Sequence, residues 1–164
     1  MKTNKRGFTL IEIMIVVAII GALVAIAGPN IYRTILKTKL TVLLYNIREL
    51  DHEVEVAWMD GAMLDYIDDG KNERIVLVAE IADRIFRKSD FRYFVVRAVG
   101  GGGKIDGYEI MFSTPDGKQL VNVSTRETGV EEWHIDQRHY LAPLLEQLLN
   151  ELGIPNTHWD GELT

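Results

Sequence analysis

One acidic residue near the start of a long apolar segment suggests chemistry at the N-terminus. Lys5, Arg6 and Gly7 precede Phe8, and Glu12 follows four residues after Phe8. A carboxylate in an apolar, membrane-length helix is unfavourable unless it finds a partner. Gly7 has no side chain to keep the backbone out of a protease cleft, and a cut after it would give Phe8 an α-ammonium. If a membrane-embedded protease cuts between Gly7 and Phe8, the new amine would pair with Glu12 of its own or a neighbouring helix and neutralise both charges.

The segment from Phe8 to Ala27 has the length and composition of a membrane span. Its only polar members are Thr9 and Glu12, and twenty helical residues extend ~30 Å, the hydrocarbon thickness of a bilayer. An alternative is a secretory signal peptide cut after Ala27, which would release a soluble exported binding domain. The apolar core of such a peptide usually runs about 7–15 residues, so the length of this segment and its acid disfavour that alternative.

A second, amphipathic half follows Pro29. Over residues 30–58 the apolar positions alternate spacings of three and four and form one stripe: Leu36, Leu40, Leu43, Ile47, Leu50, Val54 and Ala57. Such a stripe packs against a partner. Proline is tolerated near the start of a helical segment, and inside a helix it gives a kink instead of an end. We therefore predict one helix over residues 8–58, kinked at Pro29.

Residues 59–164 carry the signals of a small globular head. Strand-forming residues recur in three runs, and the last two flank a turn sequence, Thr114-Pro115-Asp116-Gly117. We predict a loop at 59–72, helices at 73–88 and 140–152, a loosely held tail after the second helix, and strands at 91–99, 108–113 and 119–125. Packing the stripe of the first helix across this antiparallel meander would bury both. The predicted fold class is α+β, with short additional helices.

The composition excludes several functions. The chain has 164 residues, 18 basic against 24 acidic, and a formal net charge of −6. An acidic chain lacks the basic surface that a nucleic-acid backbone requires, so we predict no specific nucleic-acid binding. The absence of cysteine excludes disulfides, cysteine-based zinc sites and thiol nucleophiles. No catalytic triad or phosphate-binding loop is visible, which favours a non-enzymatic protein without a cofactor.

Two groups of residues carry side chains of the types that bind metal ions. His134, Asp136 and His139 lack a set spacing and a fourth ligand, so surface histidines are the preferred interpretation. A second group of acids and one amide lies in the loop at 59–72: Asp60, Asp65, Asp68, Asp69 and Asn72. Its spacing does not match a calcium-binding loop, and a solvated acidic loop is preferred. We predict no metal site.

The run Gly7-Phe8-Thr9-Leu10-Ile11-Glu12, with its basic leader and apolar helix, resembles the N-terminal signature of the type IV pilins. That family includes the pseudopilins of type II secretion. The resemblance is close over residues 5–30 and loose over the rest. It implies cleavage after Gly7 and N-methylation of Phe8 by a prepilin peptidase. It also implies assembly contacts at Glu12 and Thr9, and a kink at Pro29.

The resemblance also implies a division of the chain and a life cycle. Residues 1–7 would be the leader, 8–29 the transmembrane and polymerisation helix, 30–58 its amphipathic half and 59–164 the head. The subunit would span the inner membrane once, with its N-terminus in the cytoplasm. It would then join copies of itself and other pilins in a periplasmic or extracellular filament, by way of an inner-membrane assembly platform. A secretion or DNA-uptake pseudopilus is the alternative.

Overall fold

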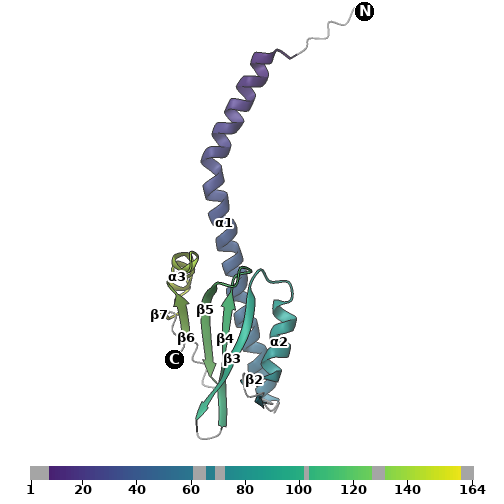
Figure 1. Cartoon of the computed structure of the whole chain (residues 1–164), viewed down its shortest axis with the longest axis vertical. Helices are drawn as coiled ribbons and strands as arrows, with labels where there is room; N and C mark the ends of the chain where they lie inside the picture. The colour runs from purple at the N-terminus through teal and green to yellow at the C-terminus, as the bar shows by residue number, and fades with distance from the viewer. Residues whose placement is uncertain (1–7, 61–65, 69–72, 102–103, 127–131, 160–164) are drawn as a thin grey trace, which may run out of the picture. The chain divides into compact units, whose positions relative to one another are not determined.

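The computed structural model describes residues 8–60, 66–68, 73–101, 104–126 and 132–159 (Figure 1). The chain divides into two compact units, one ending at Thr38 and the other beginning at Lys39. The first helix, α1, runs from Leu10 to Met59 and contributes to both units. The other elements belong to the second unit: β1 Tyr66–Asp68, β2 Glu73–Ile75, α2 Val76–Phe86, β3 Arg92–Gly101, β4 Lys104–Ser113, β5 Gln119–Arg126, β6 Glu132–Asp136, α3 Ala142–Glu151 and β7 Asn156–Trp159.

The predicted α+β class is confirmed, and the long first helix is observed close to its predicted bounds. Pro29 lies within α1, which is helical on both sides of it. The proline ring removes one backbone donor, so the carbonyl of Ala25 cannot receive the usual bond from residue 29. Five residues further on, the hydroxyl of Thr34 donates to the Asn30 carbonyl at 2.9 Å. Whether α1 bends at Pro29 stays a prediction.

The predicted three-stranded meander forms one side of a larger sheet in the second unit. Five strands lie in the order β3-β4-β5-β6-β7, and each pair is antiparallel except β6 with β7, which is parallel. The predicted turn between β4 and β5 is present: the Gly117 amide donates to the Thr114 carbonyl at 2.8 Å. Gly117 has a φ of +83° there, a conformation that glycine adopts without strain.

Two predictions about the head are wrong. The tail was expected to be loosely held, yet Asn156–Trp159 forms β7 and pairs with β6. The short helix α3 provides the crossover that a parallel pair needs. The predicted helix at 73–88 begins later than expected, because Glu73–Ile75 forms a strand that pairs with Tyr66–Asp68 in the expected loop. Pairing of backbone groups outweighed helix propensity over these three residues.

The core of the second unit lies between α1 and one face of the sheet. The predicted stripe is buried at Leu40, Leu43, Ile47, Leu50 and Val54, each at most 2% exposed, whereas Leu36 and Ala57 are half-buried. The sheet contributes the inward-facing side chains of three strands: Tyr108, Ile110, Phe112, Val121, Val123, Trp133 and Ile135. The Tyr108 hydroxyl contacts Asp51 of α1 at 3.4 Å. Packing of the stripe against the sheet is thus confirmed.

Candidate functional site

The start of α1 is closed by a reciprocal set of hydrogen bonds between Thr9 and Glu12. The carboxylate Oε2 of Glu12 accepts from the backbone N–H of Thr9 and from its hydroxyl, each at 2.8 Å. The Glu12 N–H in turn points to the Thr9 hydroxyl at 3.4 Å. This is a capping box, in which residues three apart satisfy the free donors at a helix start. It brings together the two residues predicted for assembly.

The capping box also changes the interpretation of Glu12. The sequence predicts a partner for Glu12 at the Phe8 amine, whereas the Thr-x-x-Glu spacing is itself a signal for a helix start. Phe8 lies just before the helix and is 81% exposed, while Gly7 lies outside the described residues. Both bonds to Thr9 end on one oxygen of Glu12. A carboxylate has a second oxygen, so a bond to an ammonium is compatible with the cap.

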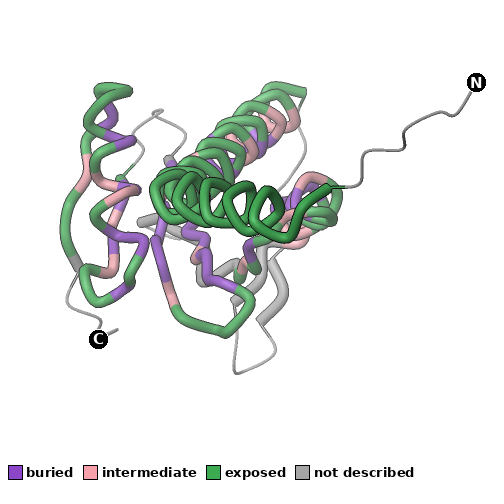
Figure 2. Tube along the Cα trace, turned by 90° about the horizontal axis from the view of Figure 1, so that it is seen from above, coloured by how far each residue is buried: buried purple, intermediate pink, exposed green. Residues whose placement is uncertain are grey.

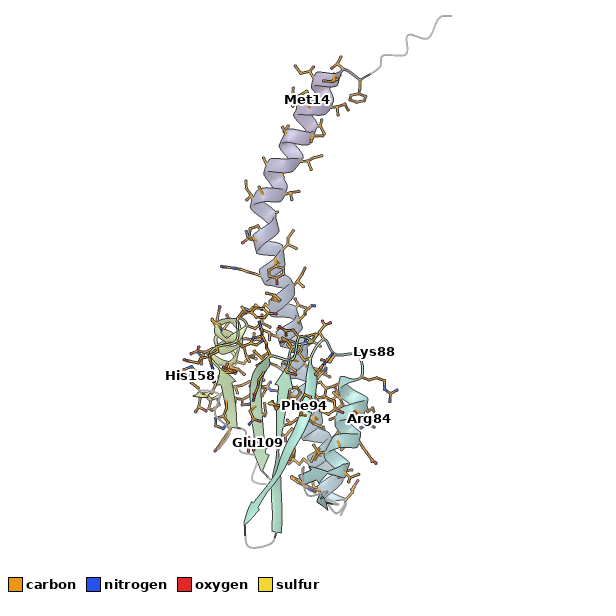
Figure 3. The ribbon with its side chains drawn as sticks, viewed as in Figure 1. Met14, Arg84, Lys88, Phe94, Glu109 and His158 are labelled. Carbon is orange, nitrogen blue, oxygen red and sulfur yellow. The ribbon has the colours of Figure 1, made fainter. Side chains whose placement is uncertain are left out.

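Beyond the cap, α1 presents apolar side chains to its surroundings on every side. Thirteen large apolar residues between Phe8 and Ile26 are at least 47% exposed, and Met14 projects freely from the helix (Figure 3). Within the described residues, α1 is the helix that is long and apolar enough to cross a membrane, and its most apolar part is not buried. An apolar surface of this extent requires a membrane or other protein to cover it.

The head holds no candidate metal centre among the residues that the structure describes, because no three metal-binding side chains converge there. His134 approaches Thr157 at 2.6 Å and Glu132 at 3.7 Å. The Asp136 carboxylate accepts from the Arg138 N–H. Of the acidic loop, Asp65, Asp69 and Asn72 lie outside the described residues.

His139 corrects the prediction of surface histidines, because it is only 4% exposed. Its Nδ1 accepts from the Leu141 N–H, and its Nε2 lies within hydrogen-bonding distance of the Thr114 hydroxyl, both at 3.1 Å. The imidazole therefore ties the β4–β5 turn to the segment before α3. Burial lowers its pKa, although the nearby Asp116 and Asp136 carboxylates oppose that effect. Its role is structural.

The fold and the N-terminal site define a class of protein: an α+β head that carries an exposed apolar helix with a capped acidic start. Comparison with known proteins narrows this class. Residues 2–28 match the prokaryotic N-terminal methylation motif. Two of the relatives described next are named as a type IV fimbrial protein and a type IV pilin.

The chain is similar to several curated proteins, each over part of its length. It is 40% identical over 65 residues to a type IV major fimbrial protein of Dichelobacter nodosus, covering 40% of this chain and 41% of the relative. It is 53% identical over 47 residues to a type IV major pilin of Myxococcus xanthus, covering 29% and 21%. The match to the prepilin peptidase-dependent protein D of Escherichia coli is 38% over 69 residues, covering 42% and 47%.

These matches have a limited span. The chain covers less than half the length of each of these relatives, and no solved structure matches it. The methylation motif likewise covers 27 of the 164 residues, all of them in the N-terminal part of the chain.

Proposed function

We propose that the chain is the precursor of a non-enzymatic subunit of a type IV pilus-like filament. A prepilin peptidase cleaves it after Gly7 and methylates the Phe8 amine, and the processed subunit then polymerises through the N-terminal part of α1. The observation that carries this proposal is the exposure of the apolar residues of α1 on every side, combined with a charged residue at its start. One of the similar proteins is itself named as prepilin peptidase-dependent.

The driving force for assembly follows from the exposed segment. Before assembly, the bilayer covers the apolar side chains between Leu10 and Ile26. Extraction from the bilayer would expose them to water, and a bundle of like helices would cover them again. Burial of each side chain of leucine or isoleucine size contributes about 1.5–3 kcal/mol relative to exposure in water. A subunit that has left the membrane is therefore stable only inside the filament.

Glu12 gives the filament a way to align its subunits. The capping box leaves one carboxylate oxygen of Glu12 for a further donor, and processing creates the N-methylated ammonium on Phe8. The two charges pair within one helix or between neighbouring helices as the bundle forms. Contact between unpaired ions and an apolar bundle is costly, so only arrangements that pair them are stable. Thr9 supports this role because it holds the Glu12 carboxylate at the helix start.

The mass of the mature chain tests processing. Purified native protein is expected to begin at Phe8 and to carry one additional methyl group. A mature chain that begins at Gly28 would replace this proposal with an exported soluble domain. A chain that keeps its leader in cells with an active prepilin peptidase would indicate a plain membrane anchor.

The exchange Glu12→Ala tests assembly. The variant is expected to be inserted in the membrane at wild-type level but to form no filaments, because the Phe8 amine loses its partner. Glu55→Ala, a change to an exposed acid further along the same helix, is the matched control and should assemble normally. Filament yield, measured by electron microscopy of sheared material, distinguishes the two variants. Normal filaments from Glu12→Ala would contradict the role of Glu12.

A further inference from the structure

The segment between β6 and α3 is tied to the rest of the head by the ring of His139. The chain leaves β6 at Asp136 and enters α3 at Ala142. Within this segment, the His139 N–H donates to the Asp136 carbonyl at 3.0 Å, and the Ala142 N–H donates to the His139 carbonyl at 2.9 Å. These two bonds join close neighbours in the sequence, whereas the contact of His139 Nε2 with the Thr114 hydroxyl, at 3.1 Å, reaches the β4–β5 turn. We call residues 137–141 the latch segment.

The ring of His139 makes its contacts in the neutral form. Its Nδ1 accepts from the Leu141 N–H at 3.1 Å, so this nitrogen carries no proton. Leu141 is the N-cap residue of α3, and its own side chain makes no capping bond. The imidazole therefore satisfies one of the free donors at the start of the helix. Because His139 is only 4% exposed, the ring, not water, fills this role.

A second proton on the ring disfavours this arrangement for three reasons. A protonated Nδ1 is a donor, and it faces the N–H of Leu141, so the bond between them is lost. The positive charge lies at the N-terminus of α3, where the helix dipole disfavours cations. The charge is also buried with His139, and burial of an ion is costly. Acid therefore acts directly on the bond that holds the start of α3.

We propose that His139 is an acid-sensitive latch: when its ring takes up a second proton, the latch segment and the first turn of α3 detach from the β4–β5 turn, while the rest of the head stays folded. Leu145 and Leu149 of α3 are fully buried, and Figure 2 shows buried residues, in purple, along this helix. β7 is paired with β6. These contacts do not involve the ring, so they confine the opening to its surroundings. Opening brings Leu141, only 3% exposed in the closed state, to the surface.

The charged and ionisable groups around the ring set the acidity at which the latch opens. They come from three segments: Asp116 and Lys118 of the β4–β5 turn, Asp136 at the end of β6, and Arg138 and Tyr140 of the latch segment. Burial has the largest effect on the pKa of His139 and lowers it. Lys118 lowers this pKa further, whereas the carboxylates of Asp116 and Asp136 raise it. The net lowering keeps the latch closed at neutral pH.

Hydrogen exchange of individual amides tests the latch in the full chain, held in detergent micelles. NMR of the labelled chain compares the Leu141 amide with the Leu50 amide of α1 in the same sample, which removes the common effect of pH on exchange. Between pH 7.5 and pH 5.0, the ratio of the two rates is expected to rise at least about fivefold, the factor that corresponds to a typical N-cap. The Leu149 amide, further along α3, is the internal control and should keep its ratio to Leu50.

Two results would overturn the inference. An unchanged ratio for Leu141 would show that the ring does not hold the segment. An equal rise for Leu141 and Leu149 would show that α3 unfolds as a whole instead of opening at its start. Neither result bears on the proposed function, because the exchange concerns only the head and is measured before any filament forms.

Variants assign the opening to His139. His139→Gln keeps a donor and an acceptor but does not titrate, so the rise at Leu141 should disappear, and a rise that persists contradicts the latch. If this variant does not fold, two exchanges in the exposed part of the β4–β5 turn replace it. Asp116→Asn removes a carboxylate that favours the charged ring and should move the opening to lower pH, whereas Lys118→Ala removes an opposing cation and should move it to higher pH. Openings at the wild-type pH in both variants would also contradict the latch.

Discussion

The Nε2 of His139 lies 3.1 Å from the hydroxyl of Thr114, although 25 residues separate them in the sequence. The other ring nitrogen accepts from the Leu141 N–H, so Nε2 carries the proton of the neutral ring and donates to Thr114. The Thr114 hydroxyl is also close to the Lys118 carbonyl, at 3.1 Å. A single neutral imidazole therefore connects the β4–β5 turn with the start of α3.

His139 is expected to make the stability of the head depend on pH. Burial lowers the pKa of His139 in the folded chain below its ordinary value of 6.5. The unfolded chain consequently binds a proton more readily, and acid favours unfolding. The contribution of neutral His139 to the stability of the head is complete above about pH 6.5. It decreases as the pH falls towards the lowered pKa of His139 in the folded chain. The urea midpoint of the detergent-solubilised chain should be lower at pH 5.5 than at pH 7.5.

A variant shows whether His139 causes this dependence. Glutamine has a donor and an acceptor but does not titrate, so His139→Gln should flatten the change in midpoint between the two pH values. His158 is the matched control, because it is exposed and pairs with Glu146 at 3.3 Å. His158→Gln should keep the wild-type pH dependence. An equal slope in all three proteins would assign the effect to other groups.

The capping box predicts that Thr9 protects the first turn of α1. Thr9→Ala removes the hydroxyl that accepts from the Glu12 N–H. The Glu12 amide should therefore exchange its hydrogen about fivefold faster in detergent micelles, the factor that corresponds to a typical N-cap. Thr9→Ser keeps the hydroxyl and should exchange at the wild-type rate. NMR of the labelled chain measures both, and equal exchange in the two variants would mean that the cap contributes nothing.

The two faces of α1 should respond very differently to truncation. Leu50 is fully buried, so Leu50→Ala removes packed methyl groups and leaves a cavity, at a typical cost of 2–5 kcal/mol in the free energy of unfolding. Tyr45 is 67% exposed, and Tyr45→Ala should change that free energy by no more than about 0.5 kcal/mol. Chemical denaturation of unassembled protein compares them. Similar losses would mean that Tyr45 also packs within the monomer.

Much of this architecture was predictable because it depends on local patterns. The spacing of Leu40, Leu43, Ile47 and Leu50 predicts both the helix and its buried face, since side chains three and four apart share one side of a helix. The turn at Gly117 follows from residue types that tolerate its backbone angles. The exposed apolar segment was equally predictable. Its residues are apolar on every side of the helix, so they lack the amphipathic pattern of a helix that packs one face on a head.

Other features depend on chain segments that meet only in the folded protein. Pairing of β7 with β6 joins Asn156–Trp159 to Glu132–Asp136, and nothing in the polar residues of β7 specifies that neighbour. The burial of His139 requires the Thr114 turn to close over it, which no local pattern reveals. Glu12 is an intermediate case, because the Thr-x-x-Glu spacing is visible in the sequence but only the structure shows Thr9 bonded to its carboxylate.

By itself, the sequence determined where the apolar helix lies, which side of its second half is buried, and that an acid stands at its start. These properties depend on residues that lie close together in the sequence, so short-range steric and hydrophobic effects are sufficient to set them. Only the tertiary structure decided the parallel strand pair and the buried state of His139. These properties arise from contacts across more than twenty residues, whose free energy depends on packing of the whole head.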